Sequence, residues 1–157
     1  MQVKDLMSST VRSVRPDTGL LEVSSLMCLY RFSGLPVVED DKLLGFIAEK
    51  DVLNRLFPSI DEFMESPSAL MDDDIQGRYS DLLGLTVKDL MVRHVITVSP
   101  EMHALRAAAM MVRHRFRRIP VADGDRLIGM LSLGDIHKAT FHSSISKMKC
   151  TAEQSAA

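Results

Sequence analysis

The pattern of apolar and polar residues along the chain occurs twice. In each half a proline, Pro16 or Pro100, follows a short apolar stretch and predicts a helix with an acid in its first turn. A second helix is expected to begin near Asp51 and near Asp135. Period-two or short apolar runs predict three strands per half: 11–14, 35–38 and 43–48, then 95–98, 119–122 and 127–132. Each half therefore reads β-α-β-β-α.

Apolar residues at helical spacing predict which face of the first helix is buried in each half. The expected stripe of the first half is Leu20, Val23, Met27 and Tyr30, and Cys28 in the same apolar segment is expected to be a buried thiol. The stripe of the second half is expected at i, i+3 and i+7, widened by two flanking positions: Leu105, Ala108 and Val112, with Ala104 and Met111.

The two halves are copies of one another at an offset of 84 residues. Val3-Lys4-Asp5-Leu6-Met7 recurs as Val87-Lys88-Asp89-Leu90-Met91, and 18 of the 51 positions from Val3 to Leu53 are identical to their counterparts without a gap. Such a repeat unit has too little sheet to bury its own apolar face.

The duplication predicts an α/β (α+β) fold, in which two β-α-β-β-α repeats pack about a pseudo-twofold axis. The expected organisation is repeat 1 at 1–57, an acidic helical or loop insert at 58–84, repeat 2 at 85–142 and a flexible tail at 143–157. Six acids and no base lie between Asp61 and Asp74, and Asp72-Asp73-Asp74 is expected to cap the helix that follows.

Charge and cysteine usage narrow the function classes. A net charge of −2 argues against a dedicated nucleic-acid binder. The four Arg and one His between Arg113 and Arg118 instead suggest a small anionic ligand. The spacings of the two cysteines and five histidines do not indicate a metal site. No apolar run approaches a membrane span, so we expect no membrane partner and a cytoplasmic location.

The end of each repeat carries its most specific pattern, Gly-φ-φ-Ser/Thr-x-x-Asp, where φ is an apolar residue. Repeat 2 has Gly129-Met130-Leu131-Ser132-Leu133-Gly134-Asp135, and repeat 1 has Gly45-Phe46-Ile47-Ala48-Glu49-Lys50-Asp51. Together with the duplication and the Leu-Pro-Val and Ile-Pro-Val strand entries, this closely resembles the cystathionine-β-synthase (CBS) domain, in the paired arrangement called a Bateman module. The resemblance covers about two thirds of the chain.

The resemblance implies a nucleotide site in the cleft between repeats. The Asp135 carboxylate would accept hydrogen bonds from the ribose hydroxyls, and Ser132 would also contact the ribose. Arg117 and Arg118 would bind the phosphate groups. Main-chain groups of the first strand of repeat 2 would read the adenine edge: Val95, Ile96 and Thr97. The implied ligand is AMP, ADP or ATP, with S-adenosylmethionine as another possibility, and no cofactor is required.

Repeat 1 departs from the family pattern in two places. Ala48 lacks the hydroxyl of Ser132, and Ser33-Gly34 stand where repeat 2 has Arg117-Arg118. One good site on repeat 2 is therefore expected. A weaker second site would use Asp51, Lys50, Thr10 and Val11.

Other interpretations stay open beside this one. Ser132 and Asp135 could simply cap a helix. The chain could be a nucleotide-independent scaffold for dimerisation or protein interaction. An enzyme is disfavoured, because the sequence has no nucleophile motif, no paired acid and base and no Walker-type loop. The resemblance implies a homodimer of CBS pairs that regulates an unknown protein in trans, as a signal-transduction module.

Overall fold

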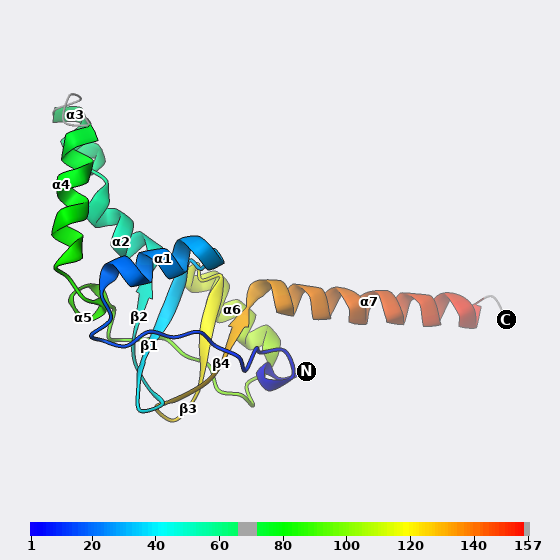
Figure 1. The fold of residues 1–157 in the computed structure, drawn as a ribbon. Helices are drawn as coiled ribbons and strands as arrows, with labels where there is room; N and C mark the ends of the chain where they lie inside the picture. Colours follow the sequence, from blue (N-terminus) through cyan, green and yellow to red (C-terminus); the bar gives the residue numbers. More distant parts are fainter. Residues whose placement is uncertain (66–71, 156–157) are drawn as a thin grey trace. The chain divides into compact units, whose positions relative to one another are not determined.

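The computed structural model describes residues 1–65 and 72–155, and it is a mixed helix and strand fold (Figure 1). The predicted α+β class is confirmed. The chain forms two compact units: the repeat-1 unit, Arg12–Val95, and the repeat-2 unit, Met1–Val11 with Ile96–Ala157. Each unit has its own aliphatic core.

The leader of each repeat packs within the unit of the other repeat. In the repeat-2 unit, the 3-10 helix η1 (Val3–Asp5) places Val3 in the core, and the Val3 N–H donates to the Met102 carbonyl (2.9 Å). In the repeat-1 unit, α5 (Val87–Leu90) buries Val87, whose N–H donates to the Thr18 carbonyl (2.9 Å). A sequence repeat is therefore not the same set of residues as a packing unit.

The aspartate of each leader has a local structural role. The Asp5 carboxylate accepts from the Gln2 N–H (2.7 Å), and the Asp89 carboxylate accepts from the N–H (2.8 Å) and the hydroxyl (3.0 Å) of Thr86. These hydrogen bonds, the backbone one first, hold the pKa of Asp89 below its ordinary value of 3.8. Helix capping thus accounts for the recurrence of Asp in Val-Lys-Asp-Leu-Met.

The glycine of each closing pattern gives space for a leader to approach. The N–H and carbonyl of Ser8 bond those of Met130, and Val92 bonds Phe46 in the same way, all at 2.9 Å. A Cβ on Gly129 would lie 3.0 Å from the Ser8 carbonyl oxygen, and a Cβ on Gly45 would lie 2.8 Å from that of Val92. Both distances are shorter than ordinary contact, so these positions need glycine.

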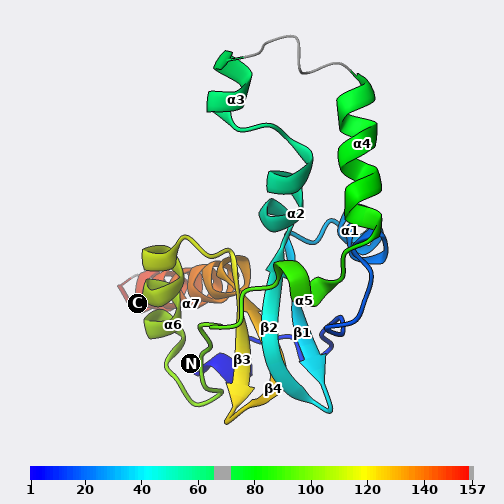
Figure 2. The same ribbon diagram turned by 90° about the vertical axis from the view of Figure 1, so that its left-hand side faces the viewer.

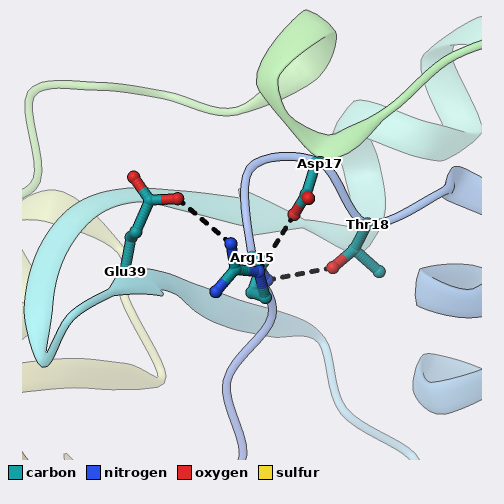
Figure 3. A network of polar contacts seen from close by, with 4 residues as sticks. All are labelled: Arg15, Asp17, Thr18 and Glu39. Atoms are coloured by element: carbon teal, nitrogen blue, oxygen red, sulfur yellow. Dashed lines mark hydrogen bonds and ion pairs between the residues drawn. The ribbon is translucent and has the colours of Figure 1, made fainter.

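The helix was expected to begin at Pro16 and Pro100, and this prediction was wrong. Pro16 lies in a turn closed by the Thr18 N–H donating to the Arg15 carbonyl (3.1 Å), and α1 (Leu20–Tyr30) begins four residues later; α6 (Ala104–His114) is displaced in the same way. Figure 3 shows Arg15 contacting the carboxylates of Asp17 (3.1 Å) and Glu39 (3.2 Å). These contacts hold the turn against the following hairpin.

The first strand of each repeat is shorter than predicted. Only Val14 and Val98 form bridges, parallel to Val37 and Val121. Val14 and Val98 each exchange main-chain hydrogen bonds with the hairpin of their own unit, but neither segment is a continuous strand.

The expected α1 stripe is buried at Leu20, Val23 and Met27, whereas Tyr30 is 48% exposed. Cys28 is exposed, so the prediction of a buried thiol was wrong. It lies one residue beyond Met27 and is therefore turned about 100° from the buried face.

The buried stripe predicted for α6 was wrong at Leu105 and Val112, whereas its flanking members Ala104 and Met111 are buried as predicted. Ala104, Ala107 and Met111 are buried, while Leu105 and Val112 are exposed. The buried positions are those of Leu20, Val23 and Met27 shifted by 84. Because α6 has apolar residues on two sides, its periodicity alone did not identify the face that packs.

The four remaining strands confirm the prediction and form one antiparallel hairpin per unit. These are β1 (Gly34–Glu39) with β2 (Lys42–Ala48), and β3 (Arg118–Asp123) with β4 (Arg126–Ser132). Asp40 and Asp41 both have positive φ (49° and 64°), as a tight two-residue hairpin turn requires.

A helix follows each hairpin, as predicted. In the repeat-1 unit α2 (Glu49–Leu56) leads into the insert helices α3 (Ile60–Glu65) and α4 (Asp72–Leu83), at the opposite end from the β1–β2 turn (Figure 2). The side chains of Asp72-Asp73-Asp74, expected to cap a helix, lie outside the described residues. In the repeat-2 unit α7 (Leu133–Ser155) continues through the expected tail as helix.

Candidate functional site

The start of α7 brings Ser132 and Asp135 together. The Ser132 hydroxyl donates to the Asp135 carboxylate (2.5 Å), and the Asp135 N–H donates to the Ser132 hydroxyl oxygen (3.1 Å). Ser132 is half-buried and Asp135 is exposed. The Ser132 hydroxyl therefore caps the helix, and it also orients a carboxylate that faces solvent.

The start of β3 places the two arginines beside this pair. Arg118 stands opposite Ser132 in the β3–β4 ladder, and the Arg117 carbonyl accepts from the Leu133 N–H (3.1 Å). Both arginines are exposed. The start of β3, with its two arginines, therefore lies next to the start of α7, with the Ser132 hydroxyl and the Asp135 carboxylate. Such a surface suits an anion that also carries hydroxyl groups.

The first-strand residues predicted to read adenine lie partly on this surface. Val98 pairs with Val121, and the two segments run parallel, so Ile96 and Thr97 precede Val98 on the side where β3 begins. Both are half-buried. Val95 is the last residue of the repeat-1 unit, and the structure does not place it relative to the others.

The corresponding helix start in the repeat-1 unit is built differently. The Asp51 carboxylate accepts from the Ala48 N–H (2.9 Å), so it serves as a helix cap without a hydroxyl neighbour. Lys50 lies beside it and is exposed. Thr10 and Val11, the other residues expected in a weaker second site, belong to the repeat-2 unit.

A phenylalanine covers the strand start of the repeat-1 unit. Gly34 occupies the position of Arg118, and a Cβ added to it would overlap Phe46 Cε1 and lie 2.9 Å from Phe46 Cζ. Gly34 pairs with Ala48 as Arg118 pairs with Ser132. The repeat-1 unit thus has Gly34 and Ala48 in place of the guanidinium and the hydroxyl, and the Phe46 ring lies against Gly34. Phe46 was not singled out from the sequence, although the repeat aligns it with Met130.

Aromatic pairs recur at the ends of α1 and α6, and they too were missed from the sequence. Tyr30 stacks on Phe32 (ring centroids 5.7 Å apart), and His114 stacks on Phe116 (5.4 Å). The Arg12 guanidinium lies 3.9 Å from the Tyr30 ring centroid, as a cation–π contact. The offset of 84 aligns both pairs and could have revealed them.

Two absences apply only to the described part of the chain. Among its His, Cys, Asp and Glu side chains, no group of three or more is arranged to hold a metal ion. Within the same residues, no helix has the length and apolar character needed to cross a membrane.

Comparison with known proteins supplies matches over nearly the whole chain. The model of the CBS domain matches residues 3–58 and 87–142. MJ1426 of Methanocaldococcus jannaschii is 33% identical over 153 residues, covering 88% of this chain and 90% of that protein. CBS domain-containing protein YhcV of Bacillus subtilis is 28% identical over 134 residues, covering 85% and 81%. A crystal structure of CBSX2 in complex with AMP matches with a TM-score of 0.71 at 26% identity, over 91% of this chain and 98% of that one.

Proposed function

Because the chain belongs to the CBS domain family and carries two CBS repeats, we propose that it is a non-catalytic regulatory module that binds an adenine nucleotide in its repeat-2 unit. The ribose would contact Asp135 and Ser132, and the phosphates would contact Arg117 and Arg118. The single observation that carries the proposal is the adjacency of Arg118 and Ser132 in the β3–β4 ladder, next to the Ser132–Asp135 hydrogen bond.

Two further observations support this assignment. CBSX2, 26% identical, has been crystallised with AMP. The repeat-1 unit lacks both arginines and the hydroxyl, and Phe46 lies over the equivalent of Arg118. One favoured site is therefore proposed.

Calorimetric titration tests the ligand and its orientation. We expect AMP, ADP or ATP to bind, with S-adenosylmethionine and adenosine as comparison ligands. Hydrogen bonds to charged groups contribute about 1.5–3 kcal/mol each, so Asp135→Ala should weaken nucleotide binding by roughly 10- to 150-fold. Arg117→Ala and Arg118→Ala should weaken ATP binding much more than adenosine binding.

Asp51→Ala is the matched control, because Asp51 is the equivalent helix-capping carboxylate. It should lower the melting temperature, since it removes the cap on the Ala48 N–H, worth about 1 kcal/mol, while nucleotide affinity at the repeat-2 site stays unchanged. Equal loss of affinity in the two variants, or no adenine compound that binds, would refute the assignment.

A nucleotide-independent scaffold is the second candidate, and one observation favours it. Ser132 and Asp135 already satisfy one another as a helix cap, so no ligand is needed to explain them. In that case every titration would be flat while partner binding persisted.

We also propose that the module is a homodimer, because both units expose apolar side chains at equivalent positions. Leu21 and Leu105, Cys28 and Val112, and Phe57 and Phe141 are pairs related by the offset of 84. Their exposed fractions are high: Leu21 60%, Leu105 54%, Val112 66%, Phe57 52% and Phe141 56%. Sedimentation equilibrium tests this proposal, and a chain that stays monomeric at high micromolar concentration contradicts it.

A further inference from the structure

The short helix α3 adds nothing to the core of the repeat-1 unit, because none of its six residues is buried. Phe57, the residue before Pro58, has an extended backbone with φ −101° and ψ 141°, as a position before proline prefers. Helix α2 therefore ends at Leu56, and α3 begins anew beyond the proline. The CBS match of this half ends at residue 58, so α3 lies beyond the part of the chain that the family pattern covers.

One side of α3 is an exposed apolar surface. Ile60, Phe63 and Met64 stand at i, i+3 and i+4, the spacing that places side chains on one face of a helix. Their exposed fractions are 81%, 44% and 73%, and that of Ile60 is the highest of any large apolar side chain in the described residues. Exposed apolar side chains that are grouped in this way mark interaction sites, whereas single ones do not.

The remaining charged positions of α3 are all acidic and exposed: Asp61, Glu62 and Glu65. Residues 57–83 have seven Asp and Glu against one basic residue, Arg78, which gives −6. The whole repeat-1 unit has fifteen Asp and Glu against nine Lys and Arg, which is also −6. The rest of that unit is neutral, with eight of each, so its negative charge is concentrated in the segment that carries α3.

Local contacts keep α3 helical although it buries nothing. The Ser59 N–H donates to the Glu62 carboxylate (2.8 Å), and the Glu62 N–H donates to the Ser59 hydroxyl oxygen (3.2 Å), which is a capping box. The Arg78 guanidinium on α4 lies 3.9 Å from the same carboxylate. Helices this short are not stable alone in water. These contacts therefore hold the three apolar side chains of α3 on one face in the absence of any core packing.

From these features we infer that α3 is the docking surface for a basic, amphipathic segment of a partner protein. Apolar side chains of that segment would cover Ile60, Phe63 and Met64, and its Lys or Arg side chains would face Asp61 and Glu65. Complementary charge favours a basic partner over an acidic one. The same acids would repel nucleic acid and anionic membrane surfaces. The inference does not depend on nucleotide binding in the repeat-2 unit.

Fluorescence anisotropy with a labelled model peptide tests the inference on the full chain. The probe contains only Leu and Lys, with Leu at i, i+3, i+4 and i+7, so that it forms a basic amphipathic helix. One comparison peptide has the same composition in scrambled order, and another has Glu in place of Lys. We expect the probe to bind at least about tenfold more tightly than either. Its binding should weaken in about 0.5 M salt, because exposed charges are then screened.

Variants on α3 identify the surface that binds the probe. Ile60→Ser combined with Met64→Ser should raise the probe Kd by more than about tenfold, because both apolar side chains would be buried in the contact. Asp61→Lys combined with Glu65→Lys should raise it by roughly tenfold and reduce its salt dependence. None of these four side chains is buried, so circular dichroism should show both variants folded as wild type.

Two variants outside the insert are matched controls. Leu29→Ser removes an apolar side chain that is 76% exposed on α1, and Asp123→Lys reverses an exposed acid at the end of β3. Neither should change the probe Kd. A probe that does not bind, or that loses affinity equally in the control and α3 variants, overturns the inference. Pelleting of the wild type with phosphatidylcholine vesicles, lost when Ile60 and Met64 are replaced by Ser, would assign α3 to a lipid surface and overturn it as well.

Discussion

Gly34→Ala tests whether the strand start of the repeat-1 unit is closed by Phe46. The backbone of Gly34 is not in the left-handed region, so alanine alone would gain roughly 0.5–1 kcal/mol from a less flexible unfolded chain. Against this, the new Cβ would overlap Phe46 Cε1, lie 2.9 Å from Phe46 Cζ and lie 3.1 Å from the Ile47 carbonyl oxygen. Carbon contacts are normally about 3.5–4.0 Å, so the ring must move.

The expected cost follows from which atoms can give way. The Phe46 side chain is half-buried and can rotate towards solvent, whereas the Ile47 carbonyl is fixed in β2. Overpacking commonly costs about 1–3 kcal/mol, so we expect a net destabilisation of about 1–2 kcal/mol. With an m-value of about 2 kcal/mol/M, the urea midpoint should fall by roughly 0.5–1 M.

A double-mutant cycle identifies the ring as the cause. Phe46→Met installs the side chain that repeat 2 has at Met130 and removes the overlap, so Gly34→Ala should cost little in that background. Urea unfolding followed by circular dichroism gives the four free energies of unfolding. Gly77→Ala, in α4 with no atom near its added Cβ, is the control and should stabilise by about 0.5–1 kcal/mol. A coupling energy near zero between positions 34 and 46 would refute the closure.

Three other predictions concern stability. The hydrogen bonds from Thr86 lower the folded-state pKa of Asp89, so they stabilise the fold above pH 3.8, and this stabilisation is lost as pH falls through the folded-state pKa. Asp89→Asn should therefore have a lower melting temperature than wild type at pH 7, and the difference should shrink towards pH 2.5. A difference in melting temperature that does not depend on pH would contradict this. Met111→Ala should cost about 2–5 kcal/mol because Met111 is buried. Val112→Ala should change the free energy of chemical unfolding, measured at low protein concentration, by less than about 1 kcal/mol. The reverse order would mean that the face with Leu105 and Val112 packs in the core. Gly129→Ala should lower the free energy of unfolding by more than about 1 kcal/mol, because the added Cβ lies against the Ser8 carbonyl oxygen, a backbone atom that cannot rotate away. An unchanged urea midpoint would show that the leader is loosely held.

The duplication made much of the site predictable. Because the repeats align without a gap, the sequence alone reveals that repeat 1 has no counterpart of Arg117, Arg118 and Ser132. The β1–β2 and β3–β4 hairpins were predicted because their turn residues and strand patterns are local properties. A capping role for Ser132 and Asp135 was also predictable, since Ser and Asp commonly begin helices.

Other features depended on contacts between residues far apart in the chain. The apolar pattern of α6 allowed either of two helix faces to be buried. Packing against the β3–β4 hairpin buries the face that carries Met111. The leaders show no sequence sign that each packs in the other repeat's unit. The closure of Gly34 by Phe46 needs a ring from the neighbouring strand, which a residue-by-residue comparison at the offset of 84 does not reveal.

The sequence by itself therefore determined the repeat, its hairpins and the chemical inequality of the two halves, because these follow from residue identity and short-range patterns. The tertiary structure decided which helix face is buried, which leader joins which core and which strand start is covered by an aromatic ring. These outcomes depend on close packing between distant segments, and packing is resolved only when the atoms of both sides are in place.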